Sequence, residues 1–85
     1  YNNAIILIGV VTVEFGEKIK HIRVQSLLSQ EAFAKELGVS YSTVNRWEKD
    51  KTKPNYRALK SIDNFCKIHK ISFDISEYAL EGHIL

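Results

Sequence analysis

Residue types that build several kinds of functional site are scarce in this chain of 85 residues. It has a single cysteine, Cys66, so no disulfide forms within one chain, and it lacks a signal-peptide pattern. Both features fit a protein of the reducing cytoplasm. The three histidines, His21, His69 and His83, have no metal-ligand spacing with the cysteine or with paired carboxylates. We therefore expect no metal site.

Glycine and proline are also few, at four and one residues, and there is no glycine-rich phosphate loop or nucleophile motif. The sequence thus predicts no enzyme, no cofactor and no small-molecule ligand. One apolar run, residues 4–15, is too short to cross a membrane. Its β-branched residues favour a β-strand, which needs a partner because an unpaired apolar edge aggregates.

The stretch 29–48 has the pattern of two short helices joined by a tight turn. A serine precedes each helix, where its hydroxyl can accept a hydrogen bond from a free backbone N–H; these serines are Ser29 and Ser40. Gly38 suits the positive φ that a helix end often requires. The two predicted helices cover about 30–37 and 41–49.

The second of these helices has one apolar and one polar face. Val44 and Trp47 lie three residues apart and point inward, and the opposite face has no apolar residue. That face carries Ser42, Asn45, Arg46 and Lys49. Most polar helix faces are simply solvated, but a capped helix after a tight turn is the arrangement that enters the DNA major groove. Arginine suits the edge of guanine there, and asparagine suits that of adenine.

Residues 18–70 resemble the phage repressor and Cro (XRE-type) helix-turn-helix family. The resemblance rests on Arg23, on the segments LSQEAFAKELGVS and STVNRWE, and on the basic loop KTKP. It implies a mainly α-helical fold of four to five helices that binds double-stranded DNA, with a phosphate contact by Gln30. The base contacts that it implies are made by Tyr41, Ser42, Asn45 and Arg46.

The same family pairs an arginine of its first helix with a glutamate that closes the recognition helix. The resemblance assigns these roles to Arg23 and Glu48, although sequence separation alone leaves open that both are ordinary surface charges. Asp50 stands where the family usually has glycine. Aspartate tolerates the left-handed conformation better than most residues, so we expect the same loop path with slight strain.

The charge is distributed unevenly along the chain. Residues 18–70 hold all twelve Lys and Arg against five acidic residues, a net charge of +7, and the flanks hold the other five acidic residues, a net charge of −5. A basic module is therefore hidden in a chain of net charge +2. We expect the helix at about 41–49, which corresponds to the recognition helix of the family, and the basic loop after it to contact phosphates. The residues that would do so are Ser40, Lys49, Lys51 and Lys53.

Two further helices complete the expected module. The first runs from about 15 to 28, with Ile19, Ile22 and either Leu27 or Leu28 in the core. The other is capped by Asn55 and runs to about residue 69, and its predicted buried stripe is Leu59, Ile62, Phe65 and Cys66.

The flanks lie outside the family pattern. Residues 71–75 alternate as a strand does, whereas the resemblance places a fifth helix near them, and both readings stay open. We expect an N-terminal strand in 1–14, a DNA-binding domain in 15–70, and a C-terminal extension in 71–85 that packs on the domain or forms a dimer interface. The strand would pair with 71–75 or with a second chain.

The predicted function is a homodimeric, sequence-specific regulator of transcription that binds double-stranded DNA. Two alternatives stay open. Since the chain begins with Tyr1, it is expected to be a processed form or a piece of a longer protein, and could be the DNA-targeting or control domain of a DNA-modifying enzyme or a toxin–antitoxin system. It could also be a protein-interaction module that uses its apolar flanks.

Overall fold

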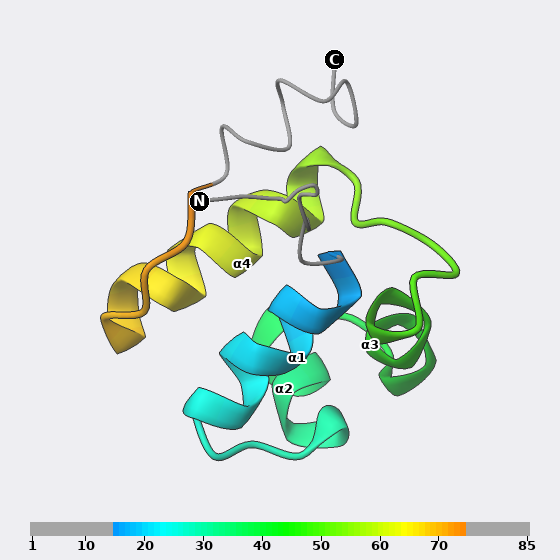
Figure 1. Ribbon diagram of the computed structural model, residues 1–85, viewed down its shortest axis with the longest axis horizontal. Coiled ribbons are helices and arrows are strands. Elements are labelled where there is room, and N and C mark those ends of the chain that lie inside the picture. Colours follow the sequence, from blue (N-terminus) through cyan, green and yellow to red (C-terminus); the bar gives the residue numbers. More distant parts are fainter. Residues whose placement is uncertain (1–14, 75–85) are drawn as a thin grey trace, which may run out of the picture.

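The structure, a computed structural model, describes residues 15–74, which contain four α-helices and no β-strand (Figure 1). The helices are α1 (Phe15–Gln25), α2 (Gln30–Leu37), α3 (Tyr41–Glu48) and α4 (Tyr56–His69). α3 packs against both α1 and α2, and α4 packs against α2. Figure 1 shows α3 at one edge of this helical body, where only part of its surface is covered by other helices.

The core between the helices is built from the apolar stripe of each one. Its centre contains an edge-to-face pair of rings, Phe33 of α2 and Phe65 of α4, with centroids 5.2 Å apart. Val44 and Trp47 anchor α3 with 0% and 3% exposure, as the spacing of apolar residues predicts. The other hydrophobic side chains of this core are Phe15, Ile19, Ile22, Ala34, Leu37, Leu59, Ile62 and Cys66.

Side-chain caps begin three of the helices as predicted. The hydroxyl of Ser29 accepts from the N–H of Ala32 at 3.1 Å, and that of Ser40 accepts from the N–H of Thr43 at 3.1 Å. The third cap, at the start of α4, is the Asn55 side chain, which accepts from the N–H of residue 58 at 2.9 Å. These caps satisfy N–H groups that have no partner within the helix.

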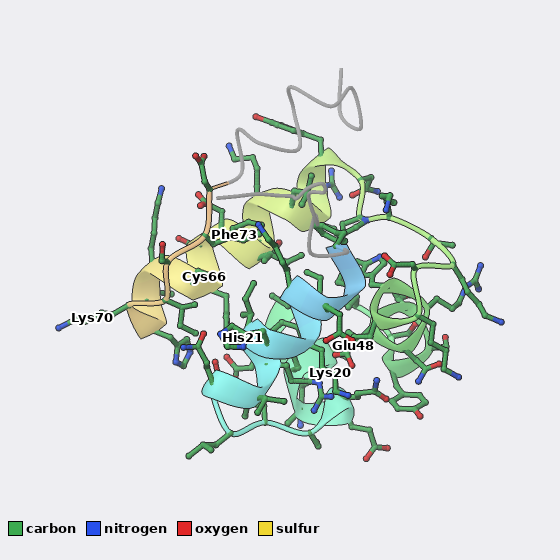
Figure 2. The ribbon with its side chains drawn as sticks, viewed as in Figure 1. Lys20, His21, Glu48, Cys66, Lys70 and Phe73 are labelled. Atoms are coloured by element: carbon green, nitrogen blue, oxygen red, sulfur yellow. The ribbon has the colours of Figure 1, made fainter. Side chains whose placement is uncertain are left out.

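All four helices end in the same way. One or two residues beyond the end of each helix, a residue takes the left-handed conformation, and the N–H of the residue after it donates to a helix carbonyl five residues back, which is the Schellman motif. The four left-handed residues are Leu27, Gly38, Asp50 and Lys70. Only one of them is glycine, and Figure 2 shows Lys70 pointing away from the helices at its end of α4.

The end of α1 differs from the prediction of a helix to about residue 28. The helix stops at Gln25, because Leu27 takes φ 60° and the N–H of Leu28 donates to the carbonyl of Arg23 at 3.2 Å. This turn also settles which leucine packs inward. Leu28 contacts the core, whereas Leu27 is 91% exposed. Similarly, α3 ends at residue 48, and Lys49 is its C-cap.

The predictions for the flanks are only partly covered by the described residues. The proposed strand at 4–15 falls outside them except for Phe15, which begins α1 as a buried residue. Residues 71–74 form neither the strand nor the fifth helix, although Ile71 and Phe73 pack against the core. Residue 75 lies outside the described residues.

The lone cysteine belongs to the core. Cys66 is 1% exposed, on the buried side of α4. Burial, with a smaller contribution from the negative charge of Asp63, raises the pKa of the Cys66 thiol to about 11. A thiol with this pKa stays protonated at neutral pH and is therefore a poor nucleophile or metal ligand.

α1 approaches the end of α3 closely at Gly16. A Cβ atom at this position would lie 2.6 Å from the backbone oxygen of Glu48 and 2.7 Å from that of Trp47. The N–H of Gly16 donates to Asp50 Oδ1 at 2.9 Å and so finds a partner outside its own helix. Lys53 Nζ lies 3.8 Å from the same oxygen. Glycine is thus needed where the two helix ends meet.

Replacing Gly16 by alanine should therefore destabilise the fold, although alanine is the better helix former by about 1 kcal/mol. We expect a net loss of roughly 1–3 kcal/mol in the free energy of unfolding, as for other overpacked sites, measured by urea denaturation. The control is Lys20→Ala on the exposed side of α1, which should stay within about 0.5 kcal/mol of the unaltered chain. A Gly16→Ala chain that is more stable than the original would contradict the close approach.

Candidate nucleic-acid interface

The uncovered side of α3 presents the predicted base-contacting residues together. Tyr41 is 50% exposed, Ser42 and Arg46 are exposed, and Asn45 is half-buried. Because Val44 and Trp47 are buried on the other side of the helix, this polar side is fixed in direction. The structure therefore brings the four predicted base contacts onto one surface.

Ser40, a predicted phosphate contact, lies at the N-terminal end of this surface. Its Oγ lies 2.8 Å from Thr43 Oγ1 and 3.1 Å from Ser42 Oγ, in addition to accepting from the N–H of Thr43. The hydroxyl is exposed but takes part in a local hydrogen-bond cluster. The N-terminus of α3 therefore presents hydroxyl groups and the positive end of the helix dipole together.

The predicted lysine contacts divide into two groups. Lys49 and Lys51 are exposed after the end of α3. Lys53 turns back toward the protein, with Nζ near Asp50 and 5.6 Å from the centre of the Phe15 ring. A hollow between the helix-turn-helix corner, α3 and the start of α4 is lined in part by Arg46, Lys53 and Arg57. Cations thus border the open side of α3.

The ion pair implied by the family resemblance is present behind this surface. Arg23 Nε donates to Glu48 Oε2 at 2.7 Å, and Arg23 Nη2 donates to Glu48 Oε1 at 3.1 Å, so the pair is bidentate. The two side chains are 14% and 6% exposed. The hydrogen bond to Glu48 raises the pKa of Arg23 above its ordinary value, against the opposing effect of burial.

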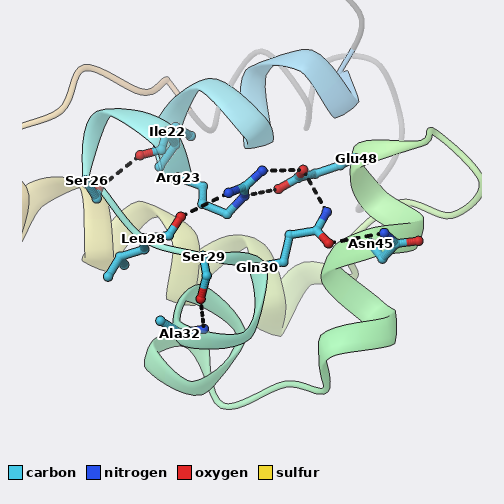
Figure 3. Close-up of polar contacts among 9 residues, drawn as sticks. All are labelled: Ile22, Arg23, Ser26, Leu28, Ser29, Gln30, Ala32, Asn45 and Glu48. Atoms are coloured by element: carbon cyan, nitrogen blue, oxygen red, sulfur yellow. Dashed lines mark hydrogen bonds and ion pairs between the residues drawn. The ribbon is translucent and has the colours of Figure 1, made fainter.

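The same guanidinium group also joins the helices. Arg23 Nη1 donates to the backbone oxygen of Leu28 at 3.0 Å, in the turn between α1 and α2 (Figure 3). Figure 2 shows Glu48 between α1 and α3. One side chain of α1 therefore holds both the turn that leads into α2 and the last residue of α3.

Gln30 and Asn45 extend this network to the exposed polar side of α3. Gln30 Nε2 donates to Glu48 Oε1 at 3.0 Å, and Gln30 Oε1 accepts from Asn45 Nδ2 at 3.2 Å (Figure 3). A predicted phosphate contact and a predicted base contact are therefore hydrogen-bonded to each other. This connection could not be predicted from the sequence, since nothing in the spacing of residues 30 and 45 signals it.

The sequence also did not predict the close approach at Gly16 or the hydrogen bond by which Asp50 caps the N-terminus of α1. A signal for Gly16 does exist, because glycine is a poor helix former in the first turn of a predicted helix.

Within residues 15–74 no group of three His, Cys, Asp or Glu side chains is arranged to hold a metal ion. No helix in the same range is long and apolar enough to cross a membrane.

The two capped helices, the turn at Gly38 and the exposed polar side of α3 define a helix-turn-helix protein. The HTH_3 helix-turn-helix family matches residues 19–71. The chain belongs to this family, and the resemblance inferred from the sequence is confirmed.

Two known proteins are similar to this chain. The HTH-type transcriptional activator BcrR of Enterococcus faecalis is 38% identical over 56 residues, which cover 66% of this chain and 28% of BcrR. This chain therefore matches little more than a quarter of that relative's length. The P22 c2 repressor protein, in a crystal structure with synthetic operator 9T, superimposes with a TM-score of 0.61 at 31% identity, over 72% of this chain and 88% of the repressor chain.

The Arg23–Glu48 pair can be tested by removing its negative charge in Glu48→Gln. The glutamine still accepts one hydrogen bond, but the guanidinium group loses its counter-ion in a poorly hydrated position. We expect a loss of about 1–3 kcal/mol in the free energy of unfolding, below the roughly 3–5 kcal/mol of a fully buried pair. Glu36→Gln makes the same change at an exposed residue of α2 and should melt like the unaltered chain. Equal melting of both variants would show that the pair contributes nothing.

Proposed function

We propose that this chain binds double-stranded DNA in a sequence-specific manner, as the DNA-binding domain of a transcriptional regulator that inserts α3 into the major groove. The observation that carries the proposal is the open polar side of α3, which is held from behind by the Arg23–Glu48 pair. The similarity to an operator-bound repressor supports it. So does the similarity to a transcriptional activator.

Each predicted contact has a role in this proposal. Arg46 reads guanine through O6 and N7, and Asn45 reads a neighbouring base edge. Tyr41 and Ser42, near the helix N-terminus, complete the base-reading set. The residues that fix the domain on the phosphate backbone are Gln30, Ser40, Lys49, Lys51 and Lys53.

The role of the chain in this proposal is binding and not catalysis, and it requires no metal ion or cofactor. A DNA-binding role and a single buried thiol are consistent with a cytoplasmic location. The chain spans only 28% of BcrR, which favours a second candidate. In that reading the same domain directs a longer protein to its DNA site, and the binding chemistry is unchanged.

We further propose that the chain acts as a homodimer, whose interface is formed by the flanks 1–14 and 71–85. Two identical domains would then read half-sites about one helical turn apart. The support is the apolar residues that these flanks hold in addition to Ile71 and Phe73, the two that pack against the core. Light scattering at high protein concentration should give the mass of a dimer, and the mass of a single chain would contradict the interface.

Base contacts and phosphate contacts are separated by Arg46→Ala and Lys51→Ala. The first variant should lose roughly 1–3 kcal/mol of binding free energy on the preferred site and relax the choice at one base pair. The second should weaken binding to all sequences alike and reduce the log–log salt slope by about 0.9. Fluorescence anisotropy on preferred and random duplexes at several salt concentrations measures both effects.

The matched control is Lys67→Ala, which removes the same charge near the far end of α4 and should leave the salt slope unchanged. An Arg46→Ala variant that loses equal affinity for random DNA would refute base recognition by Arg46. Binding that does not weaken with salt would favour the third reading, a protein-interaction module.

A further inference from the structure

The hydrogen bonds behind α3 have only one possible order of donors and acceptors. The ionised carboxylate of Glu48 only accepts, so Gln30 must present its NH₂ group to it, as the 3.0 Å bond from Nε2 shows. This turns Gln30 Oε1 toward Asn45, which must then donate from Nδ2, at 3.2 Å. The orientation of both amides therefore follows from the charge of Glu48. We call the hydrogen-bonded chain of Glu48, Gln30 and Asn45 the amide relay.

The amide relay fixes what Asn45 presents on the recognition surface. One hydrogen of Nδ2 is used by Gln30, and Figure 3 shows the amide oxygen of Asn45 on the side away from Gln30. Rotating the amide of Asn45 by half a turn would place its Oδ1 against Gln30 Oε1. Both oxygens are hydrogen-bond acceptors, so no hydrogen would lie between them. Asn45 is therefore held with Oδ1 and the second Nδ2 hydrogen available to a partner outside the protein.

We propose that Gln30 is a positioning residue that makes Asn45 select adenine, an inference that rests on the DNA-binding function proposed above. In the major groove adenine presents a donor at N6 and an acceptor at N7, which match Oδ1 and the remaining hydrogen of Nδ2. Guanine presents acceptors at both O6 and N7, so one of them would face the amide oxygen. Cytosine and thymine lack the adjacent donor and acceptor that adenine offers.

The positioning role can be distinguished from the phosphate contact proposed for the same residue. Gln30 uses one hydrogen of Nε2 for Glu48, which leaves the second hydrogen for a phosphate oxygen. Loss of a phosphate contact weakens binding to every sequence by the same factor. Loss of the amide relay changes the ratio of affinities for adenine and guanine at one base pair. The base ratio is therefore the readout that isolates positioning.

The test uses Gln30→Met, which keeps the length of the side chain but removes both hydrogen bonds. Asn45→Ala first identifies the base pair that depends on Asn45, in selections from randomised duplexes. A well-oriented bidentate contact discriminates between bases by roughly 5- to 150-fold. In Gln30→Met the preference for adenine over guanine at that pair should fall at least fivefold, because the amide of Asn45 can then turn either way. Affinity for every sequence should also fall by one common factor, because the phosphate contact of Gln30 is lost as well. The salt slope should stay unchanged because glutamine carries no charge, and so should the choices that depend on Arg46.

The chain has one other glutamine, which supplies the matched control. Gln25→Met makes the same change at an exposed residue of α1 and should leave all base preferences as they are. Unaltered adenine preference in Gln30→Met overturns the positioning role, and so does an Asn45→Ala variant with no altered base pair. In both cases the DNA-binding function stands. Failure of the unaltered chain to select any sequence would instead contradict the proposed function itself.

A measurement on the unaltered chain keeps the inference testable if Gln30→Met does not fold. In the protein without DNA, the Nδ2 protons of Asn45 should show a nuclear Overhauser contact to the side-chain protons of Gln30. If the amide of Asn45 were turned the other way, its Oδ1 would face Gln30 and its Nδ2 protons would lie farther from Gln30. Absence of this contact, with assigned and resolved signals for both amides, would overturn the proposed order.

Discussion

The bidentate ion pair between Arg23 and Glu48 is the interaction on which the position of α3 and its exposed polar side depends. It connects the last turn of α1 to the last residue of α3. The third nitrogen of the same guanidinium group, Arg23 Nη1, donates to the backbone oxygen of Leu28 in the turn that leads into α2. Buried ion pairs are weak evidence for stability, because desolvation offsets much of the attraction between the charges. Their geometry is demanding, however, and here it fixes the position of α3 relative to two other helices.

Two further contacts restrict α3 in the same region. Gly16 allows the first turn of α1 to meet the carbonyl groups at the end of α3, and Asp50 accepts a hydrogen bond from it. Val44 and Trp47 hold the opposite side of the helix in the core. The polar side of α3 is thus presented by a rigid support, as a surface that distinguishes base edges requires.

Much of the helical fold could be predicted because its signals are local. Ser29, Ser40 and Asn55 begin helices through side-chain hydrogen bonds to nearby N–H groups, and Gly38 ends one through its tolerance of positive φ. The end of α1 could not be predicted in this way. Leu27 takes the same left-handed conformation although it is not glycine, at a cost of about 1–2 kcal/mol. Nothing in the local sequence signals that a leucine adopts this conformation.

For the candidate site, the sequence predicted which side of α3 is exposed and, through family resemblance, the partner of Arg23. Both depend on patterns that recur along the chain or across a family. The bonds from Gln30 to Glu48 and to Asn45 depend instead on how side chains from α2 and α3 meet in space. Such contacts between helices have no periodicity, and so only the three-dimensional structure provides them.

The central claim is that α3 reads the sequence of double-stranded DNA, and the most direct test is selection of bound duplexes from a randomised pool at two salt concentrations. The account predicts enrichment of a palindromic consensus, with affinity that falls steeply as salt increases because phosphate contacts release counter-ions. Salt-sensitive binding without any consensus would contradict sequence reading by α3. Absence of binding even at low salt would contradict the DNA-binding function as a whole.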